Sequence, residues 1–144
     1  MREKILNLLG LMRRANAVSI GETNTGAAAR SGKAKLLLLA ADASDNARKR
    51  AEGFAAGQSL DLVRLPFTKA EISAHVGVNG CSMAAVMDLG FADALMKNLA
   101  ALLPGEYGPA AERIAERCTK ERERRKVSEA RERNKRIGKR RNSV

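Results

Sequence analysis

The sequence predicts an α/β fold: a three-layer α/β/α sandwich with a small mixed sheet, followed by a basic helical C-terminal extension. Three observations favour it. Short apolar runs typical of strands alternate with helical stretches over the first hundred residues. Residues 18–42 follow the order strand, helix, strand, which predicts a parallel pair with a right-handed crossover. The last part of the chain is highly charged, with scattered apolar residues.

Charge divides the chain. Residues 1–109 carry a net charge of +3 and residues 110–144 a net charge of +8, which together give the formal +11. We therefore expect a domain over 1–103, a linker over 104–109 and a basic, helix-prone or disordered arm over 110–144. A basic arm of this kind points to nucleic acid, with an acidic membrane surface or an acidic protein as lesser options.

The first half of the chain predicts two helices and two strands. Apolar side chains at helical spacing indicate a helix over 2–14. A strand over 18–20 is broken by Gly21, and the polar residues that follow mark the start of a helix that ends near 31–32. The run 36–40 is the next strand, and Lys33 and Lys35 flank it.

The second half predicts three more helices and two more strands. Ser44 can cap a helix over 45–57, with Gly57 at its C-terminal end. A strand over 60–65 precedes the capping box Thr68-x-x-Glu71, which starts a helix reaching residue 76. The apolar run 81–87 suits a strand covered on both faces, and Asp88 caps a helix over 89–103. The expected core residues are Leu8, Leu37, Leu39, Phe54, Val63, Ile72, Ala85, Val86, Phe91 and Leu95.

The arm favours helix without a clear apolar stripe, because its apolar residues Ile114, Val127 and Ile137 look isolated. Four pairs of opposite charge are spaced i,i+4, each worth about 0.2–0.5 kcal/mol. They are Glu116–Lys120, Glu121–Arg125, Glu129–Arg133 and Glu132–Arg136. We expect a solvated helix that orders on a polyanion. Its expected phosphate contacts are Lys135, Arg136, Lys139, Arg140 and Arg141.

The composition indicates no metal, no cofactor and no membrane segment. The two cysteines, Cys81 and Cys118, lack metal-like spacing, and a single histidine cannot complete a usual zinc set. We therefore expect a reduced, cytoplasmic protein. No signal peptide and no membrane-spanning run is predicted. Aromatic residues are scarce, which argues against a surface built on base stacking.

Enzyme activity finds little support in the sequence. Gly21 and Gly26 have the spacing of a phosphate-binding loop, but Ala27 and Ala28 stand where Lys and Ser or Thr are required. His75 lacks an evident nucleophilic partner. We expect no catalysis.

Binding finds more support. The turn after the first strand, the loop 77–82, and Lys33 with Lys35 could converge at one end of the sandwich. Glycines and small polar side chains with free backbone donors suit close approach to a sugar-phosphate backbone. From the residues alone, RNA binding by these loops is as well supported as the alternative that they are ordinary solvent-facing connections.

The combined pattern resembles a known family. The segments Gly21-Glu-Thr-Asn-Thr, Arg30-Ser-Gly-Lys-Ala-Lys-Leu-Leu-Leu-Leu-Ala with Asp42, LLGLMRRA and MDLGFADAL are similar to the kink-turn-binding ribosomal proteins called L-seven-Ae and their L-thirty-e relatives. The bacterial branch of uncertain role is the nearest. The likeness covers about residues 2–100. It implies non-catalytic binding of a kink-turn in ribosomal or regulatory RNA, within a ribonucleoprotein.

The resemblance implies two sets of contact residues. The turn and helix start enter the groove beside sheared G·A pairs, and the loop before the last strand packs on a flipped-out nucleotide. The first set is Gly21, Glu22, Thr23, Asn24, Thr25 and Ala27, and the second is Val78, Asn79, Gly80, Cys81 and Ser82. Arg30, Lys33 and Lys35 would support the backbone electrostatically.

One departure from the family pattern is Ala27, which stands in place of a usual Lys. The absence of that Lys removes a charge-assisted contact with RNA. The basic arm could replace this contact with contacts to phosphates. The alternative function is a protein-interaction module of the same fold that docks an acidic protein or a ribosomal surface.

Overall fold

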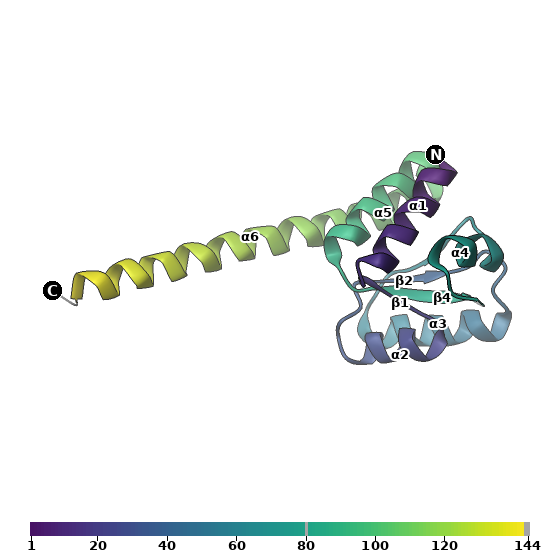
Figure 1. The fold of residues 1–144 in the computed structure, drawn as a ribbon, viewed down its shortest axis with the longest axis horizontal. Helices are drawn as coiled ribbons and strands as arrows, with labels where there is room; N and C mark the ends of the chain where they lie inside the picture. Colours follow the sequence, from purple (N-terminus) through teal and green to yellow (C-terminus); the bar gives the residue numbers. More distant parts are fainter. Residues whose placement is uncertain (80, 143–144) are drawn as a thin grey trace.

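The computed structural model describes residues 1–79 and 81–142, apart from the side chains beyond residue 136. A mixed sheet lies between two layers of helices, and a long helix projects from one side (Figure 1). The elements in order are α1 (Arg2–Arg14), β1 (Val18–Ile20), α2 (Glu22–Arg30), β2 (Leu36–Leu39), α3 (Asp45–Gln58), β3 (Leu62–Arg64), α4 (Lys69–Val76), β4 (Met83–Val86), α5 (Leu89–Leu102) and α6 (Pro104–Asn142).

The sheet has the strand order β1-β4-β2-β3. β4 runs antiparallel to both of its neighbours, β1 and β2, whereas β3 runs parallel to β2. The predicted parallel pairing of the first two strands is therefore wrong. β1 and β2 run in the same direction, but the fully buried β4 lies between them and forms hydrogen bonds with both.

Alternate residues of β2 face the two helical layers. Leu36 and Leu38 belong to the larger core with α1, α4, α5 and the first part of α6. Leu37 and Leu39 face the alanine-rich side of α2 and α3. This period of two is that of a strand buried on both faces. The predicted α/β/α sandwich is confirmed.

Element ends follow the predicted capping residues. Ser44, Thr68 and Asp88 each accept a backbone N–H at the start of a helix, and Thr68 forms the full capping box with Glu71. Some boundaries differ. Gly57 lies inside α3, which ends instead at Ser59 in the left-handed conformation. β3 and β4 are each shorter than the apolar runs that predicted them.

The expected core is mostly buried. Seven of the ten expected residues are buried, while Leu8, Phe54 and Phe91 are partly buried and pack on the margins of the core. All three lie on helices, at the border between the core face and the exposed face.

Residues 104–109, the expected linker, are helical and form the first turns of α6. We missed an apolar stripe at helical spacing, formed by Tyr107, Ala110, Ala111, Ile114 and Cys118, all of which are buried. Two of the predicted ion pairs, Glu116–Lys120 and Glu121–Arg125, are formed farther along α6. The side chains of Ile137, Lys139, Arg140 and Arg141 are not among those that the structure describes.

The first part of α6 crosses the sheet beside the edge strand β3. The Tyr107 hydroxyl donates to the carbonyl of Arg64, Arg113 pairs with Asp61 at 2.8 Å, and Arg117 donates to the carbonyl of Lys35 at 3.2 Å. Burial raises the pKa of Tyr107 to about 12, so its hydroxyl stays protonated and remains a donor. These contacts direct the helix from the last residue of β3 toward the residue that precedes β2.

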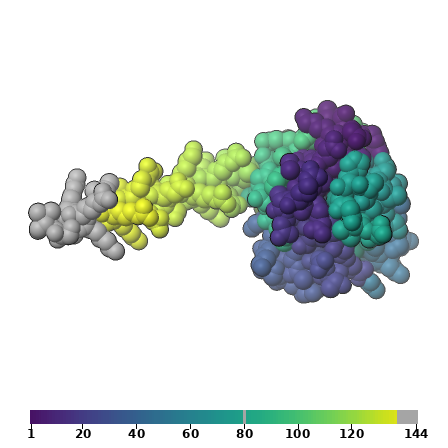
Figure 2. Space-filling view, in the orientation of Figure 1, coloured from purple at the N-terminus to yellow at the C-terminus, as the bar shows by residue number. Residues whose placement is uncertain are grey.

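Beyond Cys118 the buried stripe ends and α6 projects away from the domain (Figure 2). Residues 122–136 are all exposed. No helix in the described part of the chain is both long and apolar enough to cross a membrane.

Candidate nucleic-acid interface

Two of the predicted segments meet at one end of the sheet, which we call the loop end (residues 21–25 and 78–82, residue 80 not described). The Gly21 N–H donates to the carbonyl of Met83 at 3.0 Å, and the Ala40 N–H donates to the carbonyl of Ser82 at 2.8 Å. The segment before β4 therefore lies between the ends of β1 and β2. Residues some 60 positions apart in sequence form one surface.

The start of α2 presents backbone donors at the loop end. Gly21 is the N-cap with a φ of +96°, and no side chain caps the helix there. A side chain at Gly21 would be strained, because L residues rarely adopt this conformation. Uncapped N–H groups at a helix start favour a negatively charged group. Asn24 is exposed, and its Nδ2 donates to the carbonyl of Ile20 at 2.9 Å, which fixes its position.

Arg50 is a residue of the loop end that the sequence analysis did not select. Its guanidinium in α3 pairs with the carboxylate of Glu22 at the start of α2. The pair brings a cation to the helix start, although Ala27 offers none. Arg50 sits 28 residues from Glu22 in a different helix, so helical spacing within α2 held no signal of it.

The predicted contact residues at the start of α2 differ in how far they are exposed to solvent. Glu22 is half-buried, while Thr23, Asn24 and Ala27 are exposed. Thr25 is fully buried, and its hydroxyl has no hydrogen-bond partner within the described structure. Its side chain is therefore part of the packing under the surface.

The segment before β4 is similarly divided. Asn79 is exposed, Val78 and Ser82 are half-buried, and Gly80 lies outside the described residues. Cys81 is buried, and this burial raises the pKa of its thiol to about 11. The thiol stays protonated at neutral pH and packs as a small apolar group. Both Cys81 and Cys118 are free and buried.

The predicted basic residues Lys33 and Lys35 lie at the opposite end of the sheet, together with Arg30, and do not join the loop end. The Lys35 N–H donates to the carbonyl of Val86, the last residue of β4. Arg30 ends α2, a nine-residue helix that spans about 13 Å from the loop end. We call this the arm end, because α6 leaves the domain there. The expectation of one convergent site is wrong, since the helix between the two sets holds them apart.

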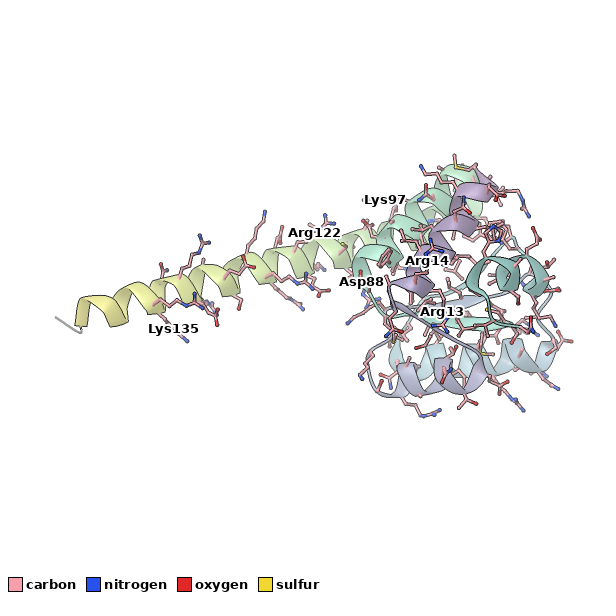
Figure 3. The ribbon with its side chains drawn as sticks, in the orientation of Figure 1. Arg13, Arg14, Asp88, Lys97, Arg122 and Lys135 are labelled. Carbon is pink, nitrogen blue, oxygen red and sulfur yellow. The ribbon has the colours of Figure 1, made fainter. Side chains whose placement is uncertain are left out.

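The arm extends the charge of the arm end. Lys135 and Arg136 are exposed on the projecting part of α6, and Figure 3 places Lys135 far beyond the domain. The side chains of Lys139, Arg140 and Arg141 are not described, so their expected phosphate contacts stay predictions.

Comparison with known proteins identifies the family. No family model matches the chain. It is 35% identical over 91 residues to an RNA-binding protein, YlxQ, from Enterococcus faecium, covering 63% of this chain and 86% of that protein. The chain belongs to the YlxQ family. This family lies within the superfamily that the sequence resembles.

A solved structure of this fold carries no functional name. It is described as a protein with unknown function from Bacillus halodurans C, and it matches with a TM-score of 0.59 and 25% identity. The match covers 64% of this chain and 92% of that one. It agrees with the sandwich described above.

Proposed function

We propose that this protein binds a folded RNA without catalysis, and that the loop end recognises a kink-turn in ribosomal or regulatory RNA. The observation that carries the proposal is the joining of the α2 start to the segment before β4 by the hydrogen bond from Gly21 to Met83. Membership of a family whose named relative is an RNA-binding protein supports RNA as the partner.

The chemistry of the loop end suits a backbone recognised by shape. Uncapped amides of α2 offer donors to a phosphate or a base edge. Glu22 would repel phosphate on its own, but Arg50 neutralises it. Arg50 therefore leaves the start of α2 with a neutral ion pair rather than with an unpaired carboxylate. Buried, free cysteines are compatible with the proposed cytoplasmic location.

The test compares two RNAs on the full chain. One is a kink-turn RNA and the other is the same RNA with its G·A pairs disrupted, each titrated across a salt series. The full chain is needed because a cut at residue 109 would remove Ile114 and Cys118 from the core. Tighter binding to the intact kink-turn supports the proposal. Equal affinity for both RNAs overturns kink-turn recognition.

Asn24→Ala sharpens this test. We expect about a tenfold loss on the intact kink-turn and almost none on the disrupted RNA, because phosphate contacts carry no sequence information. Asn98→Ala is the matched control. Its Nδ2 makes the same type of bond, to the carbonyl of Ala94 at 2.8 Å, but on α5. Equal effects of the two variants would mean that the loss is structural.

The alternative, a protein-interaction module, predicts a different outcome. It rests on the absence of the family's Lys at Ala27. In that case the full chain would bind neither RNA selectively at moderate salt, and its RNA affinity would be equally insensitive to Asn24→Ala and Asn98→Ala.

A further inference from the structure

Five basic residues follow one face of α6. Arg117, Lys120, Arg124, Arg131 and Lys135 are separated by three, four, seven and four positions. Residues at these spacings share a face of a helix. The line spans about 27 Å at 1.5 Å per residue. In its widest interval, between Arg124 and Arg131, the face carries Val127 and Ser128, so no acidic residue lies there.

This line begins on the domain. Arg117 donates to the carbonyl of Lys35 at 3.2 Å, so α6 and the segment before β2 touch here. Lys35, Arg117, Lys120 and Arg124 line one groove, together with Leu89 and Glu121. Lys120 and Arg124 also line the next groove along α6, with Val127, Ser128 and Arg131. The two grooves are therefore continuous. We call the six residues Lys35, Arg117, Lys120, Arg124, Arg131 and Lys135 the basic stripe.

The acidic residues of α6 nearest the stripe are paired or lie on its flank. Glu121 lines the first groove, but its carboxylate pairs with Arg125 at 3.2 Å. Glu123 lines the second groove on its other flank. Lys120 pairs with Glu116 at 3.3 Å, but both side chains are more than half exposed, so the pair is weak and easily exchanged for another anion.

The opposite face of α6 differs. Arg122, Lys126 and Arg133 are spaced by four and seven positions, and Glu129 falls on the same line between them. On this face, therefore, the carboxylate of Glu129 interrupts the row of three cations. The stripe side of α6 carries five cations and the opposite face three, so three cations can be removed from either face for comparison.

We propose that the basic stripe binds the sugar-phosphate backbone of an RNA duplex, as a second contact at the end of the sheet opposite the loop end. This inference rests on the proposed function and adds a stem to the element recognised there. A straight, helical row of cations suits the repeating phosphates of a duplex. Single-stranded RNA suits it poorly, because the aromatic residue of α6, Tyr107, is buried and offers no stacking surface.

The experiment uses the full chain and two triple variants that remove the same charge. Lys120→Gln, Arg124→Gln and Arg131→Gln remove the middle of the stripe. Arg122→Gln, Lys126→Gln and Arg133→Gln are the matched control on the other face. Gln has nearly the helix propensity of Lys and Arg, and circular dichroism checks that α6 is unchanged. The probes are a kink-turn RNA with one stem as long as the stripe and the same RNA with that stem cut by half.

On the long-stem RNA we expect the stripe variant to bind at least about tenfold more weakly and to lower the salt slope by about two to three. The control variant should lose less than about threefold. On the short-stem RNA the two variants should differ little. Two outcomes would overturn the stripe as a binding site. One is an equal loss of affinity in both variants, and the other is a loss in the stripe variant that is the same on the long-stem and the short-stem RNA.

These failures are separate from failure of the proposed function. Loss of discrimination between intact and disrupted kink-turns by the unaltered chain would contradict kink-turn recognition. Equal behaviour of the two triple variants, with discrimination intact, would contradict the stripe alone.

Discussion

The two ends of the sheet differ in how they present charge. At the loop end, positive and negative groups are paired, as in Glu22 with Arg50, and the available donors are backbone amides of α2. At the arm end, Lys35 adjoins a row of like-charged side chains on α6. Positioned amides can read shape, whereas a row of long cationic side chains reads only phosphate density. The fold thus places the two kinds of donor at opposite ends of the sheet, with α2 spanning the distance between them.

The path of α6 creates this separation. Its apolar stripe holds it to α5 as far as Cys118, where the helix has reached the arm end. Only there does the helix become exposed on all sides. Had the apolar stripe been one or two turns shorter, the charged part would begin over the sheet, closer to the loop end.

The strongest way to break this comparison is to detach α6. Ile114 is fully buried, and Ile114→Ala should lower the free energy of unfolding by about 2–5 kcal/mol through lost packing and a cavity. Val127→Ala is the control. That side chain is 51% exposed on the projecting part, and the expected change is within about 0.5 kcal/mol. Urea denaturation measures both, and equal effects would mean that α6 is not part of the domain.

A second prediction concerns the support of the loop end. A Cβ on Gly10 of α1 would lie 2.8 Å from the backbone carbonyl oxygen of His75 in α4. Since α4 leads into the segment before β4, Gly10→Ala should force the two helices apart and destabilise the fold by about 1–3 kcal/mol.

Gly53→Ala is the matched control for Gly10→Ala. A Cβ there meets nothing within 4 Å in α3, so helix propensity should stabilise the protein by about 0.5–1 kcal/mol. Thermal unfolding of the two variants should therefore shift in opposite directions. Shifts of the same sign would show that α1 and α4 are not tightly packed.

A third prediction tests whether the two ends of the sheet contribute independently to RNA binding. Asn24→Ala and the triple stripe variant should weaken binding of the long-stem kink-turn additively, with a coupling free energy within about 0.5 kcal/mol. Distant sites without shared partners usually behave in this way. Isothermal titration of the single and combined variants measures the coupling, and a value well above that limit would mean that both ends contact one feature of the RNA.

The smallest effect concerns acid pH at the start of α4. The hydrogen bond from the Thr68 backbone N–H, followed by the other contacts with Thr68 and Arg2, lowers the pKa of Glu71. A lowered folded-state pKa means stability that is present above the unfolded value of about 4.5 and lost as pH falls through the folded value. Unfolding of wild type and Glu71→Gln between about pH 6 and pH 3 should show a steeper acid loss in wild type. Parallel curves would contradict the capping role of this carboxylate.

Much of the fold could be predicted from local signals. The bounds of α1 and β1 agree with the prediction to the residue, and three predicted N-caps accept the expected hydrogen bonds. The errors arose where competing local signals were weighed wrongly. In residues 104–118, two prolines, two glycines and many charges outweighed a helical apolar stripe that was visible in the sequence.

The candidate site was predicted in part. The turn after β1 and the segment before β4 were chosen correctly as neighbours, but Lys33 and Lys35 were placed with them wrongly. Arg50 was missed, since nothing within α3 connects it to Glu22. Such relations depend on which strands are adjacent, and the insertion of β4 between β1 and β2 has no signature in either strand.

The sequence by itself determined the alternation of strands and helices, their capping residues and the row of basic residues along α6, because each depends on residues a few positions apart. Tertiary structure alone decided which ends of the elements lie together. In the folded chain, residues 21–25 lie beside the segment before β4. Lys33 and Lys35 lie at the opposite end of the sheet, where the carbonyl of Lys35 accepts a hydrogen bond from Arg117 of α6. The physical reason is that strand order and helix packing are set by burial of apolar surface from distant segments, which no local pattern encodes.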